Sequence, residues 1–194
     1  MVIFINGSFG VGKTTVSYLL SRELAKSVVF NPEPIGVALL RLAAWWPLQQ
    51  RTDDFQDLAV WRFLNARIIG FLHRSGSNII VPMAFSNLSY LEGLLAYLRG
   101  RGVPTLHFCL IAPHAVVLER LAARETQGPT QWQLRRSAEC CDAHRAPEFA
   151  EHISTTGRSA QELAKEIADR VRRDLQHARP QAAISDASSA RRDR

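Results

Sequence analysis

The sequence predicts an α/β fold, a three-layer α/β/α sandwich in which helices cover both faces of a five-stranded parallel sheet. Short segments made almost entirely of apolar residues alternate along the chain with longer segments of helical apolar period. Strands of a parallel sheet are apolar throughout because helices bury both of its faces. A glycine-rich turn joins the first apolar segment to the first helix, as in the first βα unit of a doubly wound fold.

The expected elements alternate from the first residues onward. The expected strands are apolar runs at residues 2–6, 27–31, 78–83 and 105–112, with a short strand near residues 151–155. The expected helices have apolar residues at three- and four-residue spacing and span residues 14–26, 35–46, 54–74, 89–102, 114–125 and 159–177. This alternation of strand and helix favours a parallel sheet, because parallel strands need crossover helices.

Length and composition predict one domain. The 194 residues, 46% of them apolar, suit a single core, which we place at residues 1–177. Residues 178–194 are rich in Ala, Ser and Arg and predict a disordered tail. The chain shows no basic leader and no apolar run of bilayer length, and its three cysteines lack metal-ligand spacing. These features predict a cytoplasmic protein with reduced thiols.

The charge balance argues against a dedicated nucleic-acid protein. The chain has 24 basic and 18 acidic residues, so its formal net charge is +6, a mild excess that also suits polyanionic small molecules. No run of five like charges and no RNA-binding signature occurs in the sequence. No nucleic-acid partner is therefore expected.

The stretch GSFGVGKTT, residues 7–15, fits the pattern Gly-x-x-x-x-Gly-Lys-Thr between a strand and a helix. Glycines allow successive N–H groups to point at a phosphate, and the next helix adds its positive end. Lys13 is expected to reach the β- and γ-phosphates, and the Thr14 hydroxyl to ligate Mg²⁺. The sequence therefore predicts that ATP with Mg²⁺ is bound by Gly7, Ser8, Phe9, Gly10, Val11, Gly12, Lys13, Thr14 and Thr15.

Two other classes of protein with this loop lack support in the sequence. A GTPase would carry Asn-Lys-x-Asp for guanine, and no such stretch occurs. A motor-type ATPase would end its third strand in an acid for the metal, whereas this strand continues as IIVPMAFSN. The size of the chain and a late arginine-bearing segment instead indicate a small-molecule or nucleotide kinase.

Such a kinase works by positioning and charge neutralisation, and it needs an acid near the acceptor hydroxyl. Glu33 follows the second strand, whose C-terminal end opens beside the phosphate site; a solvated loop glutamate is the alternative. Asp53 and Asp54 precede the next helix, and one of them suits the helix cap. The other is a candidate to hold metal-bound water or to act as the base.

Arginines are also needed around the moving phosphoryl group. Arg62 and Arg67 lie on the long helix, and Arg62 is the candidate for contacting the acceptor; surface salt bridges are the alternative for both. A polar segment at residues 126–147 follows the helix LERLAARE and predicts a mobile lid that closes over the nucleotide. At least one of four arginines near this segment is expected to contact phosphate: Arg120, Arg124, Arg135 and Arg136. Arg124 is the candidate for a catalytic role.

Taken together, these segments resemble the tunicamycin-resistance ATP-binding proteins. The resemblance rests on INGSFGVGKT, NPEPIG, DDFQDLAVWR, IIVPM and FAEHIST, in this order, and extends to about residue 177. The family is more distantly similar to the chloramphenicol phosphotransferases, which share the P-loop kinase architecture. The resemblance implies ATP-dependent protection against a nucleoside antibiotic by phosphorylation of one of its hydroxyls.

Tunicamycin also carries a fatty acyl chain, which would need an apolar groove. Residues 35–48 are apolar almost all round a helix, so they either pack in the core or line such a groove. Trp45, with Trp46, is the candidate for substrate binding if the groove exists.

The sequence departs from the family pattern in two places. Related kinases tend to have an aspartate after the second strand, where this chain has Asn31. An amide cannot act as a base, which moves that role to Glu33 or an aspartate near residue 53. Some family members are thought to have a membrane-associating amphipathic C-terminus, whereas residues 178–194 have few apolar residues and no helical stripe. Membrane association is therefore not expected.

The leading hypothesis is a kinase of ATP·Mg²⁺ that acts on a hydroxyl of a tunicamycin-like nucleoside. In it, Lys13 neutralises the transferring phosphate and Glu33 or Asp53 accepts the hydroxyl proton. A non-catalytic protein that sequesters the drug would use the same loop without a base, and a housekeeping nucleotide or metabolite kinase is the third hypothesis. The sequence gives no indication of the oligomeric state.

Overall fold

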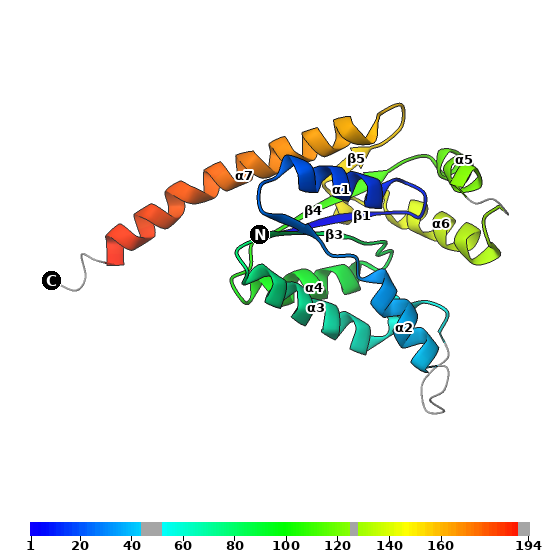
Figure 1. The fold of residues 1–194 in the computed structure, drawn as a ribbon, viewed down its shortest axis with the longest axis horizontal. Helices are drawn as coiled ribbons and strands as arrows, with labels where there is room; N and C mark the ends of the chain where they lie inside the picture. Colours follow the sequence, from blue (N-terminus) through cyan, green and yellow to red (C-terminus); the bar gives the residue numbers. More distant parts are fainter. Residues whose placement is uncertain (44–51, 125–127, 190–194) are drawn as a thin grey trace.

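A computed structural model describes residues 1–43, 52–124 and 128–189 of the chain (Figure 1). Its centre is a five-stranded parallel sheet, which confirms the predicted fold class. The strands are β1 (Val2–Gly7), β2 (Ser27–Val29), β3 (Asn78–Pro82), β4 (Thr105–Ile111) and β5 (His152–Ser154). They lie in the order β2-β3-β1-β4-β5, so β1 is central and pairs with both β3 and β4.

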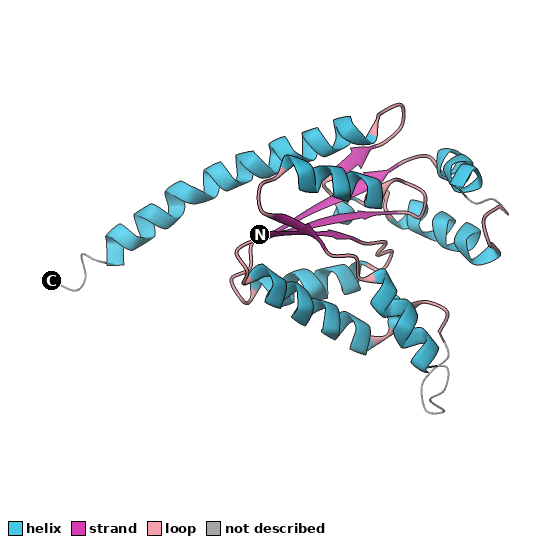
Figure 2. Cartoon of the chain, viewed as in Figure 1, coloured by secondary structure: helices cyan, strands magenta, loops and turns pink. Residues whose placement is uncertain are grey.

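Helices form a layer on each face of the sheet (Figure 2). One face carries α1 (Lys13–Glu23) and α7 (Ala160–Ser189), and the other carries α3 (Ala59–His73) and α4 (Leu88–Arg99). The remaining helices are α2 (Glu33–Ala43), which packs against α3, and the paired α5 (His114–Arg124) and α6 (Gln131–Ala143). The last two lie at the end of the sheet where β1 passes into the glycine-rich loop.

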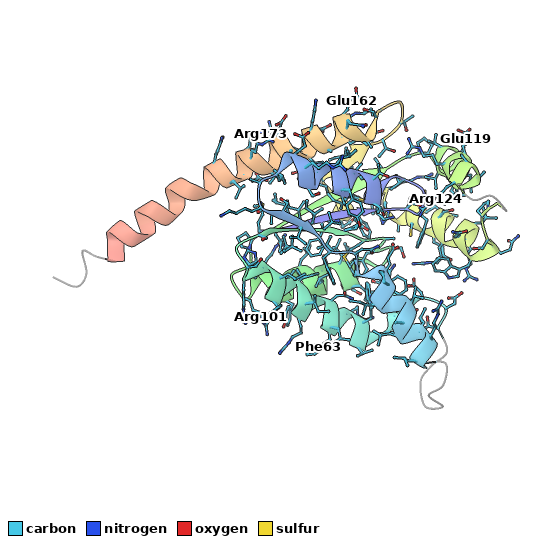
Figure 3. The ribbon with its side chains drawn as sticks, in the orientation of Figure 1. Phe63, Arg101, Glu119, Arg124, Glu162 and Arg173 are labelled. Atoms are coloured by element: carbon cyan, nitrogen blue, oxygen red, sulfur yellow. The ribbon has the colours of Figure 1, made fainter. Side chains whose placement is uncertain are left out.

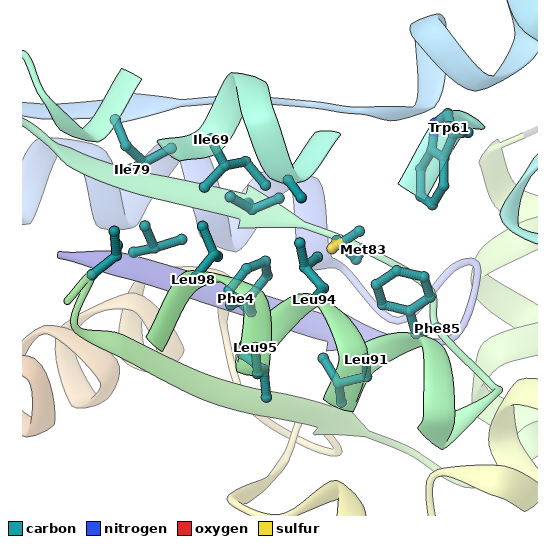
Figure 4. Packing of buried hydrophobic residues seen from close by; sticks show 14 of the residues in the cluster. Phe4, Trp61, Ile69, Ile79, Met83, Phe85, Leu91, Leu94, Leu95 and Leu98 are labelled. Carbon is teal, nitrogen blue, oxygen red and sulfur yellow. The ribbon is translucent and has the colours of Figure 1, made fainter. Parts of the chain in front are cut away.

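Alternate residues of β1 point to opposite faces and build two separate cores. Val2 and Phe4 belong to the core under α3 and α4, whereas Ile3 and Ile5 belong to the core under α1 and α7. All four side chains are fully buried. Figure 4 shows the first core, in which Phe4 lies between Ile69 of α3 and the leucines of α4. The strand is apolar throughout because both faces are covered.

The predicted helix 54–74 is wrong in its first turn. A 3-10 turn, η1 (Phe55–Asp57), precedes α3, and Leu58 between them is extended, with φ −71° and ψ 111°. The Asp54 carboxylate accepts the N–H of Gln56 at 2.9 Å and so caps this short turn. The break leaves Asp53 and Asp54 facing α6, with which both form ion pairs.

Two other boundaries differ from the prediction. α2 begins at Glu33, and Trp45 and Trp46, the candidates for an apolar groove, lie outside the described residues. The backbone of α7 stays helical as far as Ser189, so residues 178–189 form helix where a disordered tail was predicted. None of the helices in the described ranges combines the length and the apolar content needed to cross a membrane.

Candidate active site

The glycine-rich loop, residues 7–15, joins the C-terminal end of β1 to the first turn of α1. Gly10 has φ 78°, and a Cβ atom added to it would lie 2.8 Å from Cγ of Leu121 in α5. Gly12 has φ 105° at the N-cap of α1, and a Cβ atom added there would meet nothing within 4 Å. The backbone at Gly12 is thus open to a ligand, and the first N–H groups of α1 have no partners within the helix. This loop has the form of an anion cradle.

Lys13 is the buried cation of this loop. Its side chain is only 6% exposed, and its Nζ donates to the Ser8 carbonyl at 2.8 Å and lies 5.3 Å from the ring centre of Phe9. Burial lowers the pKa of Lys13, and the charge of Glu33 acts in the opposite direction. A buried ammonium with one carbonyl partner has free donor capacity for phosphate oxygens. The loop therefore fits a nucleotide triphosphate, and the exposed Thr14 hydroxyl in the first turn of α1 fits a metal held with it.

Glu33 is placed by the start of α2. Asn31, the residue that departs from the family pattern, accepts the backbone N–H of Glu33 with its side-chain oxygen at 3.0 Å. The Pro32 carbonyl accepts the indole N–H of Trp61 at 3.1 Å, which ties this turn to α3. Asn31 therefore helps to form the turn that presents Glu33. From this position the charge of Glu33 raises the pKa of Lys13, against the effect of burial.

A polar cavity of about 430 Å³ lies between η1, the segment after β3, and α6. Asp54 and Arg136 form its buried ion pair, at 2.6 Å, with side chains only 11% and 12% exposed. Burial raises the pKa of the Asp54 carboxyl, and this effect outweighs the opposing influence of the Gln56 N–H and the Arg136 charge. Asp53 pairs with Arg135 at the exposed rim. The cavity is lined by Asp53, Asp54, Gln56, Asp57, Ser86, Asn87, Tyr90, Arg135, Arg136 and Glu139.

The two arginines predicted on the long helix have structural partners. Arg62 donates to the Gln56 carbonyl at 2.5 Å and stacks over the ring of Tyr90, 4.0 Å from its centre. Arg62 therefore braces two residues of the polar cavity and does not line it. Arg67 lies further along α3, against Phe63 and away from the glycine-rich loop. The structure does not bring Arg67 to the site.

Of the four later arginines, Arg120, Arg135 and Arg136 have partners within the described part of the chain, and Arg124 has none there. Arg120 donates to the Val11 carbonyl at 3.2 Å and to Thr155, and so braces the glycine-rich loop against the segment after β5. Arg124, exposed at the end of α5, has no hydrogen-bond or ion-pair partner among the described residues, and its charge lowers the pKa of Lys13. The Arg124 guanidinium is thus exposed and close enough to Lys13 for its charge to act on that residue. Figure 3 shows Arg124 between α5 and α6.

The sequence did not predict how closely α6 packs on the loop. Ser8 donates its hydroxyl to the Ser137 carbonyl at 3.2 Å, and the rings of Phe9 and Trp132 meet edge to face with centres 5.2 Å apart. His144, at the end of α6, lies 2.6 Å from the Phe85 carbonyl and donates its Nε2–H to it. These contacts join residues more than 50 positions apart, so no local pattern in the sequence could have indicated them.

The sheet order and the glycine-rich loop after the central strand define a P-loop protein of the kinase-like α/β type. A model of the AAA domain family matches residues 2–147. The chain belongs to this family.

The solved structure of the Deinococcus radiodurans tunicamycin resistance protein is 35% identical, with a TM-score of 0.70 over 88% of this chain and 94% of that chain. This similarity confirms the resemblance that the motifs indicated. A gluconokinase from Sinorhizobium meliloti 1021 is 16% identical (TM-score 0.66, covering 91% of this chain and 96% of that chain). A shikimate kinase from Acinetobacter baumannii in complex with shikimate is 17% identical (TM-score 0.54, 89% and 93%). At these identities the two kinases show the fold alone. A comparison with curated proteins found no significant match.

Proposed function

We propose that the protein is an ATP-dependent phosphotransferase that moves the γ-phosphoryl group to a hydroxyl of a tunicamycin-like nucleoside. The observation that carries this proposal is the P-loop with its buried Lys13, together with Glu33 at the start of α2, whose charge acts on Lys13. A kinase needs a phosphate cradle and a carboxylate on the acceptor side of it. The similarity to a tunicamycin resistance protein supports the choice of acceptor.

Lys13 serves the transferring phosphate. Its Nζ, which donates to the Ser8 carbonyl at 2.8 Å, turns to the β- and γ-phosphate oxygens when nucleotide enters. The first turn of α1 binds the phosphates through its N–H groups. The Thr14 hydroxyl would hold Mg²⁺, and a bound Mg²⁺ would supply positive charge to neutralise the phosphates. Residues 7–15 thus form the donor half of the site.

Glu33 is the better candidate for the proton acceptor. The acceptor oxygen bonds to the γ-phosphorus while the bond from phosphorus to the bridging oxygen of ADP breaks, and the hydroxyl proton passes to a carboxylate. Asp53 and Asp54 are both engaged with guanidinium groups of α6, whereas Glu33 has no ion-pair partner among the described residues. Asp53, at the exposed rim, remains the alternative base.

Arg124 and α6 close the site in this proposal. Arg124 lies near Lys13 without a competing partner in the described chain, so it suits the charge that spreads over the transferring group. α6 already contacts the loop through Ser137 and Trp132. Movement of α6, which lies within the predicted lid, would admit the nucleotide and then exclude water.

The charged residues that line the polar cavity favour an acceptor without charge. Its lining contains four carboxylates, Asp53, Asp54, Asp57 and Glu139, against the two guanidinium groups of Arg135 and Arg136. The excess negative charge of the lining repels an anionic acceptor. The hydroxyl, amide and carboxylate groups of the lining residues can form hydrogen bonds with the hydroxyls of a nucleoside or sugar.

Mass spectrometry of tunicamycin incubated with the protein, ATP and Mg²⁺ tests the proposal. We expect a gain of one phosphoryl group, about 80 Da. The Lys13→Ala protein should give none, and Glu33→Gln should lower the rate by about 10²-fold or more while Asp53→Asn retains most of it. ATP-dependent binding of the drug without any mass change would instead indicate sequestration. Equal activity of Glu33→Gln and the wild-type protein would remove Glu33 as the base.

A further inference from the structure

A second cavity, of about 520 Å³, lies between the C-terminal ends of α3 and α4. The buried residues Ala66 and Val103 form its floor, and the exposed residues Arg67, Arg74 and Arg101 stand around it. It lies at the N-terminal ends of β3 and β4, and the glycine-rich loop lies at the opposite end of the sheet. Figure 3 shows Arg101 on this side of the molecule, far from Arg124. The cavity is therefore separate from the proposed active site.

A glycine on α3 keeps this cavity open. A Cβ atom added to Gly70 would meet only Cδ2 of Leu98, at 4.0 Å. An added Cβ atom would therefore fit without a clash, and a longer side chain at this position would enter the cavity. Glycine in a helix interior costs about 1 kcal/mol relative to alanine, and at Gly70 no close packing requires it.

The guanidinium groups around the cavity have no carboxylate partners. Neither Arg67, Arg74 nor Arg101 forms an ion pair within the described part of the chain, and none of the lining residues is acidic. Elsewhere the arginines of α6 and α7 pair with acids, as Arg136 does with Asp54 and Arg170 with Glu166. Residues 58–106 carry five arginines and one glutamate, so this layer of the fold has a local net charge of +4.

Aromatic side chains accompany these arginines. The Arg101 guanidinium stacks 3.7 Å from the ring centre of Tyr97 and also donates to the Tyr97 carbonyl at 3.4 Å. This stack holds the guanidinium at the rim of the cavity. Phe71, which also lines the cavity, is 71% exposed. A phenyl ring so exposed offers a free face to a flat ligand group.

We propose that this cavity binds a small polyanion that carries a flat ring, the chemistry of a nucleoside diphosphate. Arg67, Arg74 and Arg101 hold the phosphates, because guanidinium groups bind phosphate oxygens bidentately. Phe71 takes the ring. The volume lies in the range of small-molecule sites, and a concave site of this size favours a small ligand over a flat protein or lipid surface.

Isothermal titration calorimetry with ADP and Mg²⁺ tests the proposal by measuring how many ADP molecules each chain binds. The wild-type chain should bind two ADP molecules, and the Lys13→Ala protein should retain one. In the Lys13→Ala background, the double substitution Arg67→Ala/Arg101→Ala should lower the affinity of the remaining site for ADP at least 30-fold. Gly70→Leu, which fills the cavity and keeps every charge, should abolish ADP binding at this site. The control substitution Arg22→Ala/Arg145→Ala removes the same charge from exposed positions elsewhere. It should leave the affinity for ADP unchanged.

Two further probes distinguish the ligand classes. Inorganic pyrophosphate should bind the Lys13→Ala protein at least tenfold more weakly than ADP, and Phe71→Ala should erase that difference. A single ADP site in the wild-type chain with none in Lys13→Ala would overturn the proposal. So would arginine-dependent binding to phosphatidylglycerol vesicles without any binding of ADP, because that result would make this face a lipid surface. Loss of phosphotransferase activity would bear on the proposed function and not on this site.

Discussion

Burial decides the protonation behaviour of two side chains beside the glycine-rich loop. Lys13 loses water on burial, which lowers its pKa, although the nearby Glu33 partly restores it. His144 is 1% exposed, and burial lowers its pKa to about 4. The first residue was predicted from a local motif, whereas the second was not predicted.

His144 should make the stability of the fold depend on pH. Its folded-state pKa of about 4 lies below the ordinary 6.5, so the unfolded chain binds more protons between these values and stability rises with pH there. As pH falls from 6.5 to about 4, His144 should remove up to about 3 kcal/mol of unfolding free energy. Urea unfolding at several pH values should show this slope in the wild-type protein and a shallower one in His144→Gln.

An NMR titration of the His144 ring provides the direct control. A midpoint above pH 6 in the folded protein would contradict the expected loss. It would mean that the contact with the Phe85 carbonyl stabilises the imidazolium more than burial destabilises it.

Helix α2 matters because it carries Glu33, whose charge raises the pKa of Lys13 against the effect of burial. Its start was predicted as a loop, and its contact with η1 depends on one glycine. A Cβ atom added to Gly36 would lie 2.3 Å from Cγ of Phe55. The close approach of α2 to η1 thus requires a residue without a side chain, and it places Glu33 near Phe55 and Gln56 of η1.

The variant Gly36→Ala should destabilise the protein and disturb the site. Overpacking of this kind costs about 1–3 kcal/mol, and relief of the clash would move α2 together with Glu33. Gly93→Ala is the matched control, because Gly93 lies in α4 and a Cβ atom there meets nothing within 4 Å. It should be neutral or stabilising by up to about 1 kcal/mol.

Thermal unfolding and the rate of phosphoryl transfer should be measured together for these two glycine variants. Gly36→Ala should lose both stability and rate. Equal behaviour of the two variants would show that α2 adapts freely to the added methyl group.

At the scale of the whole molecule, charge is unevenly distributed. The chain carries +6 overall, and residues 58–106 alone account for +4. The polar cavity at α6 runs against this trend, with more carboxylates than guanidinium groups in its lining. The molecule thus presents an acidic cavity on one side and a basic cavity on the other.

This distribution predicts selectivity for an uncharged acceptor. A neutral nucleoside should show a kcat/KM at least 100-fold above that of a carboxylate-bearing sugar acid, because like charges within a cavity oppose binding. The double substitution Asp57→Asn/Glu139→Gln should lower the ratio of the two kcat/KM values, nucleoside over sugar acid, about tenfold. Asp142→Asn/Asp169→Asn, which removes two exposed charges elsewhere, should leave it unchanged. A higher kcat/KM for the sugar acid would exclude the neutral acceptor.

The sequence by itself determined the fold class, the phosphate loop and the family. These depend on spacing within short segments: apolar runs that need burial on both faces, helical periods, and glycines placed before Lys13 and Thr14. The tertiary structure alone decided that the charge of Glu33 acts on Lys13, that Asp54 is buried against Arg136, and that Arg62 stacks on Tyr90. Those contacts join residues that are distant in sequence, and their formation depends on how the helices pack on the sheet.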